Sequence, residues 1–188
     1  MIDFKQLAQQ YKSELLDRVM PFWMEKSIDT EFGGYFTCLE RNGEVFDTDK
    51  FIWLQGREIW MLATLYNKVE KRQEWLDAAI QGAEFLKRYG HDGNLNWYFA
   101  LDREGHPLVE PYNIFSYTFA VIAFGQLSIA TGNAEYADIA KKTFDIVLSK
   151  VDNPKGRWSK ASPGARSPKS FALPLILCNV ALGIEPLL

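Results

Sequence analysis

Residues 33–45 read GGYFTCLERNGEV, and residues 96–105 read NWYFALDREG. Both stretches carry an aromatic run that is followed by a turn sequence, Arg-Asn-Gly at 41–43 and Arg-Glu-Gly at 103–105. A glycine turn between short apolar runs predicts a β-hairpin in each stretch. The two hairpins lie about 62 residues apart, and this recurrence decides the fold.

Two helical segments follow each predicted hairpin. Apolar residues recur at spacings of three and four over 51–69 and 73–89, and again over 112–131 and 134–150. The repeating unit is therefore a hairpin followed by two helices. Self-similarity at such a period predicts an all-α fold, built as an array or a closed ring of helical hairpins.

Further segments extend the pattern in both directions. Residues 3–26 have the spacing of an amphipathic helix, with Asp3 as its N-cap. A third copy opens at Gly156-Arg157-Trp158, with a helix from about Pro168. The sequence thus predicts about three helical hairpins with short β-hairpins between them, within a single domain over 1–188.

The last predicted helix is apolar on nearly every side. Residues 175–184 read LILCNVALGI, whereas the terminal repeat of an open array presents a polar outer face. A helix that is apolar all round must be covered on several sides. We therefore expect the chain to stop inside a larger structure; the alternative is a homodimer in which the partner covers this helix.

Composition excludes several classes of protein. The chain has 188 residues, of which 47% are hydrophobic and 24% are charged, and this excludes a disordered chain. A net charge of −3 gives no general attraction to nucleic acid or to an anionic membrane. Pro174, Asn179 and Glu185 interrupt the only long apolar stretch, so a membrane helix is not expected.

Cysteine usage and the N-terminus point to the cytoplasm. Cys38 and Cys178 lie too far apart for a zinc motif and form no disulfide framework, which predicts a reducing compartment. The first five residues include Asp3 and no apolar run, so no signal peptide is expected. No metal site is predicted.

The most informative polar group lies in residues 51–57, FIWLQGR. Trp53 and Arg57 are four residues apart and share one face of the predicted helix. An aromatic face beside a fork of N–H donors suits a sugar. The alternative is that Arg57 pairs with Glu58 or another carboxylate at the surface.

The equivalent stretch of the second repeat, residues 111–119, reads PYNIFSYTF. In a ring of hairpins, equivalent helix starts gather at one end of the inner helices. Tyr112, Asn113, Ser116 and Tyr117 are therefore candidates for a pocket. The alternative is that they are core residues with satisfied hydroxyls.

The histidines and the basic loop complete the candidates. His91 and His106 lie in turn sequences, and we expect both to be exposed loop residues. No Ser–His–Asp arrangement, HExxH motif or paired-carboxylate motif is evident. Residues 155–166 form a basic loop that either binds phosphate or serves as a solvated connector.

The order of four segments resembles the N-terminal half of the N-acylglucosamine 2-epimerase family, and more distantly the cellobiose 2-epimerases. These segments are GGYFTCLERNG, DTDKFIWLQGREIW, NWYFALDREGHPLVEPYNIFS and DNPKGRWSKASPGAR. The resemblance runs over nearly the whole chain. It implies an (α/α)6 barrel of about twice this length, of which this chain is the first half.

The resemblance also implies a reaction, the inversion of C2 in N-acylated aminosugars, which interconverts N-acetylglucosamine and N-acetylmannosamine. A proton leaves the carbon next to the carbonyl of the open-chain sugar, an enediolate forms, and a proton returns on the opposite face. Two opposed acid–base groups are needed, and the resemblance places these as histidines in a second half. Neither His91 nor His106 matches them, so the chain alone is expected to be inactive.

The resemblance assigns residues as well. Arg57 matches the family's first-half arginine, which implies that it holds the sugar O1 as charge develops. Trp53, Tyr112, Asn113 and Ser116 fall near the family's sugar pocket.

No cofactor is expected to be required, but some members of the family use ATP as a non-reacting effector. The resemblance places that contact near Lys155, Arg157 and Lys160. The alternative functions are a disaccharide 2-epimerase or aldose–ketose isomerase of the same barrel class, and a non-enzymatic sugar-binding module of helical repeats.

Overall fold

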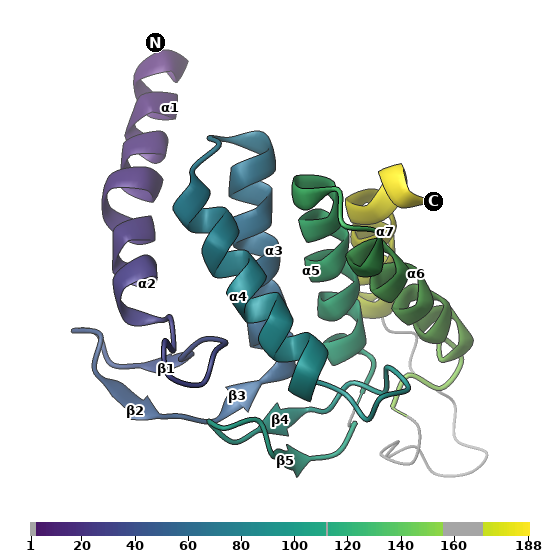
Figure 1. Cartoon of the computed structure of the whole chain (residues 1–188). Helices are drawn as coiled ribbons and strands as arrows, with labels where there is room; N and C mark the ends of the chain where they lie inside the picture. The colour runs from purple at the N-terminus through teal and green to yellow at the C-terminus, as the bar shows by residue number, and fades with distance from the viewer. Residues whose placement is uncertain (1–2, 112, 156–170) are drawn as a thin grey trace.

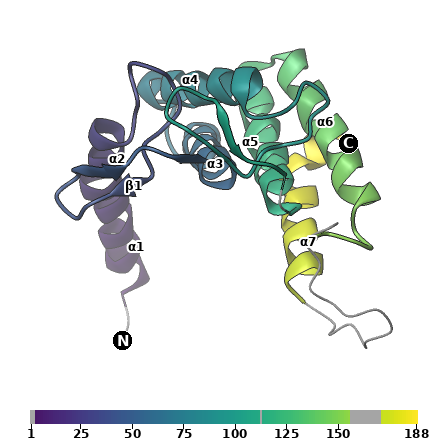
Figure 2. The same cartoon turned by 90° about the horizontal axis from the view of Figure 1, so that it is seen from below.

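The computed structural model describes residues 3–111, 113–155 and 171–188. The helices form an arc in two layers (Figures 1 and 2). The inner layer holds α3 (Ile52–Lys68), α5 (Phe115–Thr131) and α7 (Ala172–Ile184), and the outer layer holds α4 (Gln73–Tyr89) and α6 (Ala134–Ser149). The N-terminal helical region lies at one end of the arc, and α7 with a final 3-10 turn (Glu185–Leu187) lies at the other. The helical-hairpin repeat predicted from the sequence is confirmed.

The N-terminal region is helical over the predicted length. It consists of α1 (Phe4–Ser13), a π-helical stretch (Glu14–Val19) and α2 (Met20–Lys26). Asp3 caps it as predicted, because its Oδ1 accepts hydrogen bonds from the backbone N–H groups of Lys5 and Gln6. No residue of α1 is buried, and α1 projects beyond the other helices (Figure 1).

Short strands join the helical hairpins. β1 (Cys38–Leu39) and β2 (Val45–Asp47) form the predicted first hairpin. β4 (Ala100–Leu101) and β5 (Pro107–Val109) form the second. A further strand, β3 (Lys50–Phe51), pairs antiparallel with β4, and Ile52 N–H donates to the Phe99 carbonyl. The second hairpin is therefore bonded directly to the start of α3.

Two predicted helix starts are wrong by a few residues. The helix expected from 112 begins at Phe115 with Ile114 as its N-cap, and Asn113 Oδ1 accepts the Phe115 N–H at 2.8 Å in a turn just before the helix. The helix expected from about Pro168 begins at Ala172 in the part of the chain that the structure describes. The predicted opening of the third copy, Gly156-Arg157-Trp158, lies outside the described residues.

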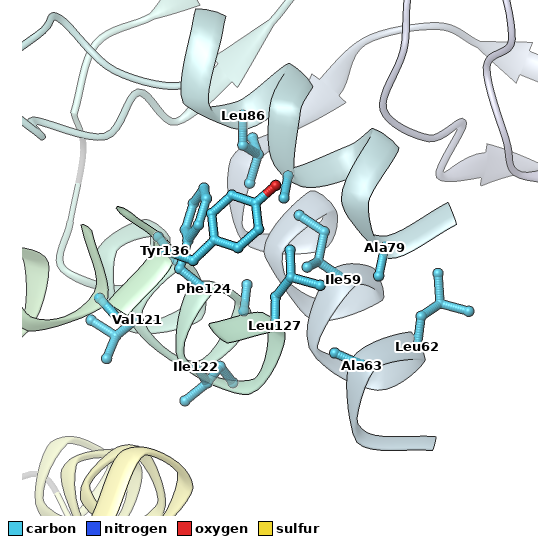
Figure 3. Packing of buried hydrophobic residues seen from close by; sticks show 14 of the residues in the cluster. Ile59, Leu62, Ala63, Ala79, Leu86, Val121, Ile122, Phe124, Leu127 and Tyr136 are labelled. Carbon is cyan, nitrogen blue, oxygen red and sulfur yellow. The ribbon is translucent and has the colours of Figure 1, made fainter. Parts of the chain in front are cut away.

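The core lies between the two layers, and Figure 3 shows its centre. Side chains from α3, α4, α5 and α6 meet there, among them Ile59, Leu62, Ala79, Leu86, Phe124 and Tyr136. Close backbone approach makes this packing possible. A Cβ at Gly56 would lie 2.9 Å from the Phe119 carbonyl oxygen, so α3 and α5 touch where a larger residue does not fit.

A buried charge cluster connects the first turn of α3 to both hairpin regions. The Lys50 ammonium is fully buried and donates to Asp29 Oδ2 at 2.9 Å, to the Gly33 carbonyl and to the Arg103 carbonyl at 2.8 Å. Arg103 donates to both oxygens of Asp29. Burial acts to raise the pKa of Asp29, but the hydrogen bonds from Arg103 and Lys50 outweigh it and hold this pKa at about 2.

Removing one partner of this cluster is expected to destabilise the fold. Lys50→Met deletes the charge but keeps the volume, which leaves the Asp29 carboxylate buried with one partner fewer. We expect a loss of about 3–5 kcal/mol in the free energy of unfolding, measured by urea denaturation. Lys142→Met is the control, since it breaks an exposed pair with Asp138 and should cost less than about 1 kcal/mol. Equal effects of the two substitutions would contradict the assigned role.

Candidate functional site

Arg57 is an exposed residue of the inner layer, and its side chain lies against a pair of aromatic rings, Trp53 and Phe119, that contact each other. Its guanidinium carbon is 4.9 Å from the centre of the Trp53 ring and 4.7 Å from that of Phe119. Trp53 precedes Arg57 by one helical turn on α3, as the spacing predicts, whereas Phe119 comes from α5. The close approach at Gly56 brings Phe119 within reach. Two stacking contacts of this kind restrict a long side chain to one region of space.

The surface ion pair considered as an alternative for Arg57 is not formed. Among the ion pairs of residues 3–111, 113–155 and 171–188, none includes Arg57. Its neighbour Glu58 is buried and is hydrogen-bonded to the Ser27 hydroxyl instead. The rings contain no acceptor oxygen, so these contacts leave the guanidinium N–H groups available to a ligand.

Burial shifts Glu58 toward the protonated, neutral form of its carboxyl group. Burial raises its pKa to about 7, and the hydrogen bond with Ser27 only partly opposes the shift. The Ser27 hydroxyl also donates to the Trp23 carbonyl at 2.7 Å. The Ser27 hydroxyl is thus shared between the Trp23 carbonyl and the Glu58 carboxyl group.

A cavity of about 360 Å³ opens beside these groups, between the N-terminal helical region and α3. We call it the edge groove; it is lined by Leu15, Val19, Met20, Trp23, Thr37, Leu54, Arg57, Glu58 and Met61. Its lining is largely apolar. The buried Thr37 Oγ1 faces no hydrogen-bond partner among the described residues. Arg57 thus contacts the aromatic pair and also borders the groove.

The start of α5 contains the other predicted pocket residues. Asn113 is half-buried and its Oδ1 accepts the Phe115 N–H, while Ser116 is buried and its Oγ has no partner within the described part of the chain. Tyr117 is a core residue, as the alternative interpretation holds, because it is buried and accepts a hydrogen bond from Lys150. Burial raises its pKa to about 12. Tyr112 lies outside the described residues.

The first turns of α3 and α5 lie on the same side of the helical layers, the side on which the strands lie (Figure 1). The pairing of β3 with β4 holds these two regions together. The prediction that equivalent helix starts gather at one end is therefore confirmed for the first two repeats.

The two histidines differ in their surroundings. His106 is exposed as predicted, and its ring nitrogen lies 2.9 Å from Asp102 Oδ2, which raises its pKa. His91 is not fully exposed, because its ring packs edge-on against Trp97, and burial lowers its pKa. Both contacts are local turn contacts.

Most of the predicted effector site lies outside the described residues. Lys155 is exposed, and Arg157 and Lys160 lie outside the described residues. No three His, Cys, Asp or Glu side chains converge as metal ligands within 3–111, 113–155 and 171–188. In the same ranges no helix has both the length and the apolar character needed to cross a membrane.

Comparison with known proteins identifies the family. The sequence profile of the N-acylglucosamine 2-epimerases (GlcNAc 2-epimerases) matches residues 34–177. The chain belongs to the N-acylglucosamine 2-epimerase family. The match includes Trp53, Arg57 and the start of α5.

Relatives of known name support this membership. The N-acylglucosamine 2-epimerase of Bos taurus is 41% identical over 170 residues, which cover 88% of this chain and 40% of that protein. The human enzyme of the same name is 39% identical over the same length. The cellobiose 2-epimerase of Bacteroides fragilis is 28% identical over 158 residues, covering 82% of this chain and 40% of that protein. The chain therefore spans about 40% of the length of these relatives.

Solved structures identify the fold as that of an (α/α)6 barrel. Cellobiose 2-epimerase from Bacillus thermoamylovorans superimposes with a TM-score of 0.83 at 20% identity, covering 98% of this chain and 51% of that one. A D-mannose isomerase superimposes with a TM-score of 0.73 at 20% identity, covering 91% of this chain and 44% of that one. The arc thus corresponds to about half of the family's barrel.

Three residues of this region escaped the sequence interpretation. The contact of Phe119 with Arg57 joins two different repeats. The helical period shows which face of α5 carries Phe119, but it does not show which helix packs on that face. Glu58 resembled a surface charge beside Arg57. Lys50 preceded the helix without any signal of burial. In the sequence, only the equivalence of residues 51–57 and 111–119 in the two repeats indicates that α5 contributes to the site.

Replacing Glu58 tests its protonation. A raised pKa in the folded state gives a stabilisation that is complete below the unfolded pKa of about 4.5 and is lost as pH rises through 7. Glu58→Gln mimics the neutral form. Relative to the unchanged chain, it should gain up to about 3 kcal/mol in unfolding free energy between pH 5 and pH 9.

Denaturant titrations at several pH values measure this difference. The exposed Glu44 provides the control, since Glu44→Gln should show no such pH dependence. A flat difference for Glu58→Gln would contradict a buried, neutral carboxyl group.

Proposed function

We propose that this chain forms the first half of a sugar 2-epimerase that inverts C2 of N-acylated aminosugars, with N-acetylglucosamine and N-acetylmannosamine as the substrate pair. Family membership and about 40% identity to enzymes of that name support the proposal. The observation that carries it is Arg57, which lies against the aromatic pair of Trp53 and Phe119 with no competing carboxylate among the described residues.

The proposed role of Arg57 follows from the chemistry of the reaction. Removing the proton next to a carbonyl moves negative charge onto the carbonyl oxygen, and a fixed cationic donor stabilises that charge most where it develops. Arg57 presents several N–H donors and stays charged at any physiological pH. Trp53 offers an aromatic face to the C–H groups of the sugar. Tyr112, Asn113 and Ser116 are proposed to line the same pocket.

The acid–base groups are proposed to come from outside this chain. The reaction needs one group on each face of the sugar carbon. His106 is tied to Asp102 in a turn, and His91 is packed on Trp97, so neither is assigned to proton transfer. We propose residues 1–188 as the N-terminal half of one barrel domain.

Further properties are proposed on the same basis. No cofactor is required, and ATP is an effector that contacts Lys155, Arg157 and Lys160. The proposed partners are the sugar substrate and a second copy of the protein in a homodimer. Neither nucleic acid nor a membrane is proposed as a partner, and the proposed location is the cytoplasm. A binding test with ATP and the triple alanine variant of these residues checks the effector role.

A second candidate function is epimerisation of a disaccharide or aldose–ketose isomerisation. The relationship to a cellobiose 2-epimerase and the structural likeness to a D-mannose isomerase favour it. These reactions share the same proton-transfer chemistry, so the shape of the sugar-binding pocket determines which substrate is used. Turnover of N-acetylmannosamine, cellobiose and mannose by the same preparation distinguishes the candidates.

The role of Arg57 is testable in a chimera. This chain replaces the matching 170 residues of the bovine relative, and the three sugars are compared. We expect N-acetylmannosamine to be turned over, and Arg57→Ala to lower kcat by about 10²–10³. Phe119→Ala should lower kcat less, because Arg57 is present but less well held.

The control is Arg88→Ala on α4, which also removes an arginine lying on an aromatic ring, here Tyr89. Its activity should be unchanged. Equal activity of Arg57→Ala and Arg88→Ala would overturn the site and favour a sugar-binding module without catalysis.

The isolated chain provides an independent test. Incubated with N-acetylmannosamine, the 188-residue chain is expected to form no N-acetylglucosamine, since it lacks opposed acid–base groups. Chromatographic product analysis over long incubation measures this. Turnover that depends on His91 or His106 would show that the acid–base assignment is wrong.

A further inference from the structure

The first turn of α5 presents an aromatic side chain that lies outside the predicted set of pocket residues. Phe115 has 36% of its surface exposed, whereas residues 116–118, which follow it directly, are all buried. A ligand can contact only the surface that it can reach. Within this turn of α5, Phe115 therefore offers the surface that a bound molecule would touch.

The phase of the helix places Phe115 on the inner face of α5. Phe124 follows it by nine residues, about two and a half turns, and therefore lies on the opposite face of the helix. Phe124 packs on Trp97 and on Tyr136 of the outer helix α6, with ring centres 5.7 and 5.8 Å apart. The face that carries Phe115 thus points away from the outer layer, toward the concave side of the arc (Figure 2).

Phe115 continues the aromatic surface of the candidate site. It precedes Phe119 by four residues, so the two side chains share one face of α5 and lie one turn apart, about 5.4 Å along the helix. Phe119 contacts both Arg57 and Trp53, and the ring centres of Phe119 and Trp53 are 6.1 Å apart. The repeat makes the two pairs equivalent, because Phe115 and Phe119 follow Trp53 and Arg57 by 62 residues each. Arg57 is thus a charged group with apolar rings beside it on α5.

The chemistry of the proposed substrate determines which of its groups suits the Phe115 ring. In an N-acetylated aminosugar every chain carbon carries oxygen or nitrogen, whereas the methyl carbon of the acyl group carries neither. Burying a methyl group against a phenyl ring is favourable, and burying a hydroxyl there without a partner costs free energy. The acyl group is attached at C2, next to the carbonyl carbon. A sugar whose O1 lies at Arg57 therefore keeps this group close to the neighbouring rings.

We propose that Phe115 is a specificity residue that contacts the methyl of the substrate's N-acyl group. This inference rests on the proposed function and deepens it, since it assigns recognition of the acyl group to α5. Arg57 holds the reacting end of the sugar, and Phe115 distinguishes an acyl group that has a methyl from one that lacks it. The contact exists before and during the reaction, so it affects KM more than kcat.

A thermodynamic cycle between Phe115 and the methyl group tests the contact. The chimera with the bovine relative is assayed with N-acetylmannosamine and with N-formylmannosamine, which differ by that methyl alone. We expect Phe115→Ala to lower kcat/KM about tenfold for the N-acetyl sugar, mainly through KM, and less than about twofold for the N-formyl sugar. Phe115→Tyr keeps the ring and should keep the preference for the N-acetyl sugar.

Phe4→Ala is the matched control, because Phe4 is a phenylalanine with 74% of its surface exposed on α1, which projects beyond the other helices (Figure 1). It should leave kcat/KM unchanged for both sugars. The ratio between the two sugars separates recognition from damage to the fold. A loss of folded protein lowers both values by one factor, whereas a lost methyl contact lowers only the N-acetyl value.

The contrary results are equally definite. An equal loss for the two sugars in Phe115→Ala, or a preference for the N-acetyl sugar that survives this substitution, would overturn the contact. Turnover that still depends on Arg57 would then leave the proposed function standing. A chimera that turns over neither sugar without any substitution would overturn the proposed function, and the methyl contact with it.

Discussion

The arrangement of α3 depends on one buried ammonium group. Lys50 has no exposed surface, and its three donors point to Asp29, Gly33 and Arg103, which belong to both hairpin regions. Taking such charges out of water is costly, and only a complete set of partners offsets that cost. The two hairpin regions therefore have little freedom to move apart. Lys50 lies on β3, two residues before α3 begins, so the same bonds hold the strand that leads into that helix.

The candidate site follows from this fixed start. One turn into α3 come Trp53 and Arg57, and the missing side chain at Gly56 lets α5 approach until Phe119 reaches the guanidinium. A cation that lies against aromatic rings keeps its N–H donors, whereas one bound to a carboxylate has already used some of them. Glu58, the nearest carboxyl group in sequence, is instead bonded to Ser27. The arrangement thus keeps a positive donor available on the inner face.

The same repeat that builds the core creates unpaired faces at its two ends. A helical hairpin buries its apolar side only against neighbours, so an arc necessarily has two ends that differ from its middle. In the middle, α5 is buried on nearly all sides by α3, α6 and α7. Toward the two ends of the described arc lie the edge groove and several exposed apolar side chains of α7, among them Leu175 and Leu182. The inner site and the end faces are thus two consequences of one packing rule.

The sequence by itself determined the repeating unit, the helix at 73–89 to the residue, and the shared face of Trp53 and Arg57, because periodicity and turn glycines are local signals. It did not reveal β3, which is two residues long, or the turn at Asn113 that precedes α5. The burial of Lys50 and Glu58 and the contact of Phe119 with Arg57 were decided by tertiary structure alone. These features join residues between 17 and 62 positions apart, and no local pattern records which distant groups share a buried space.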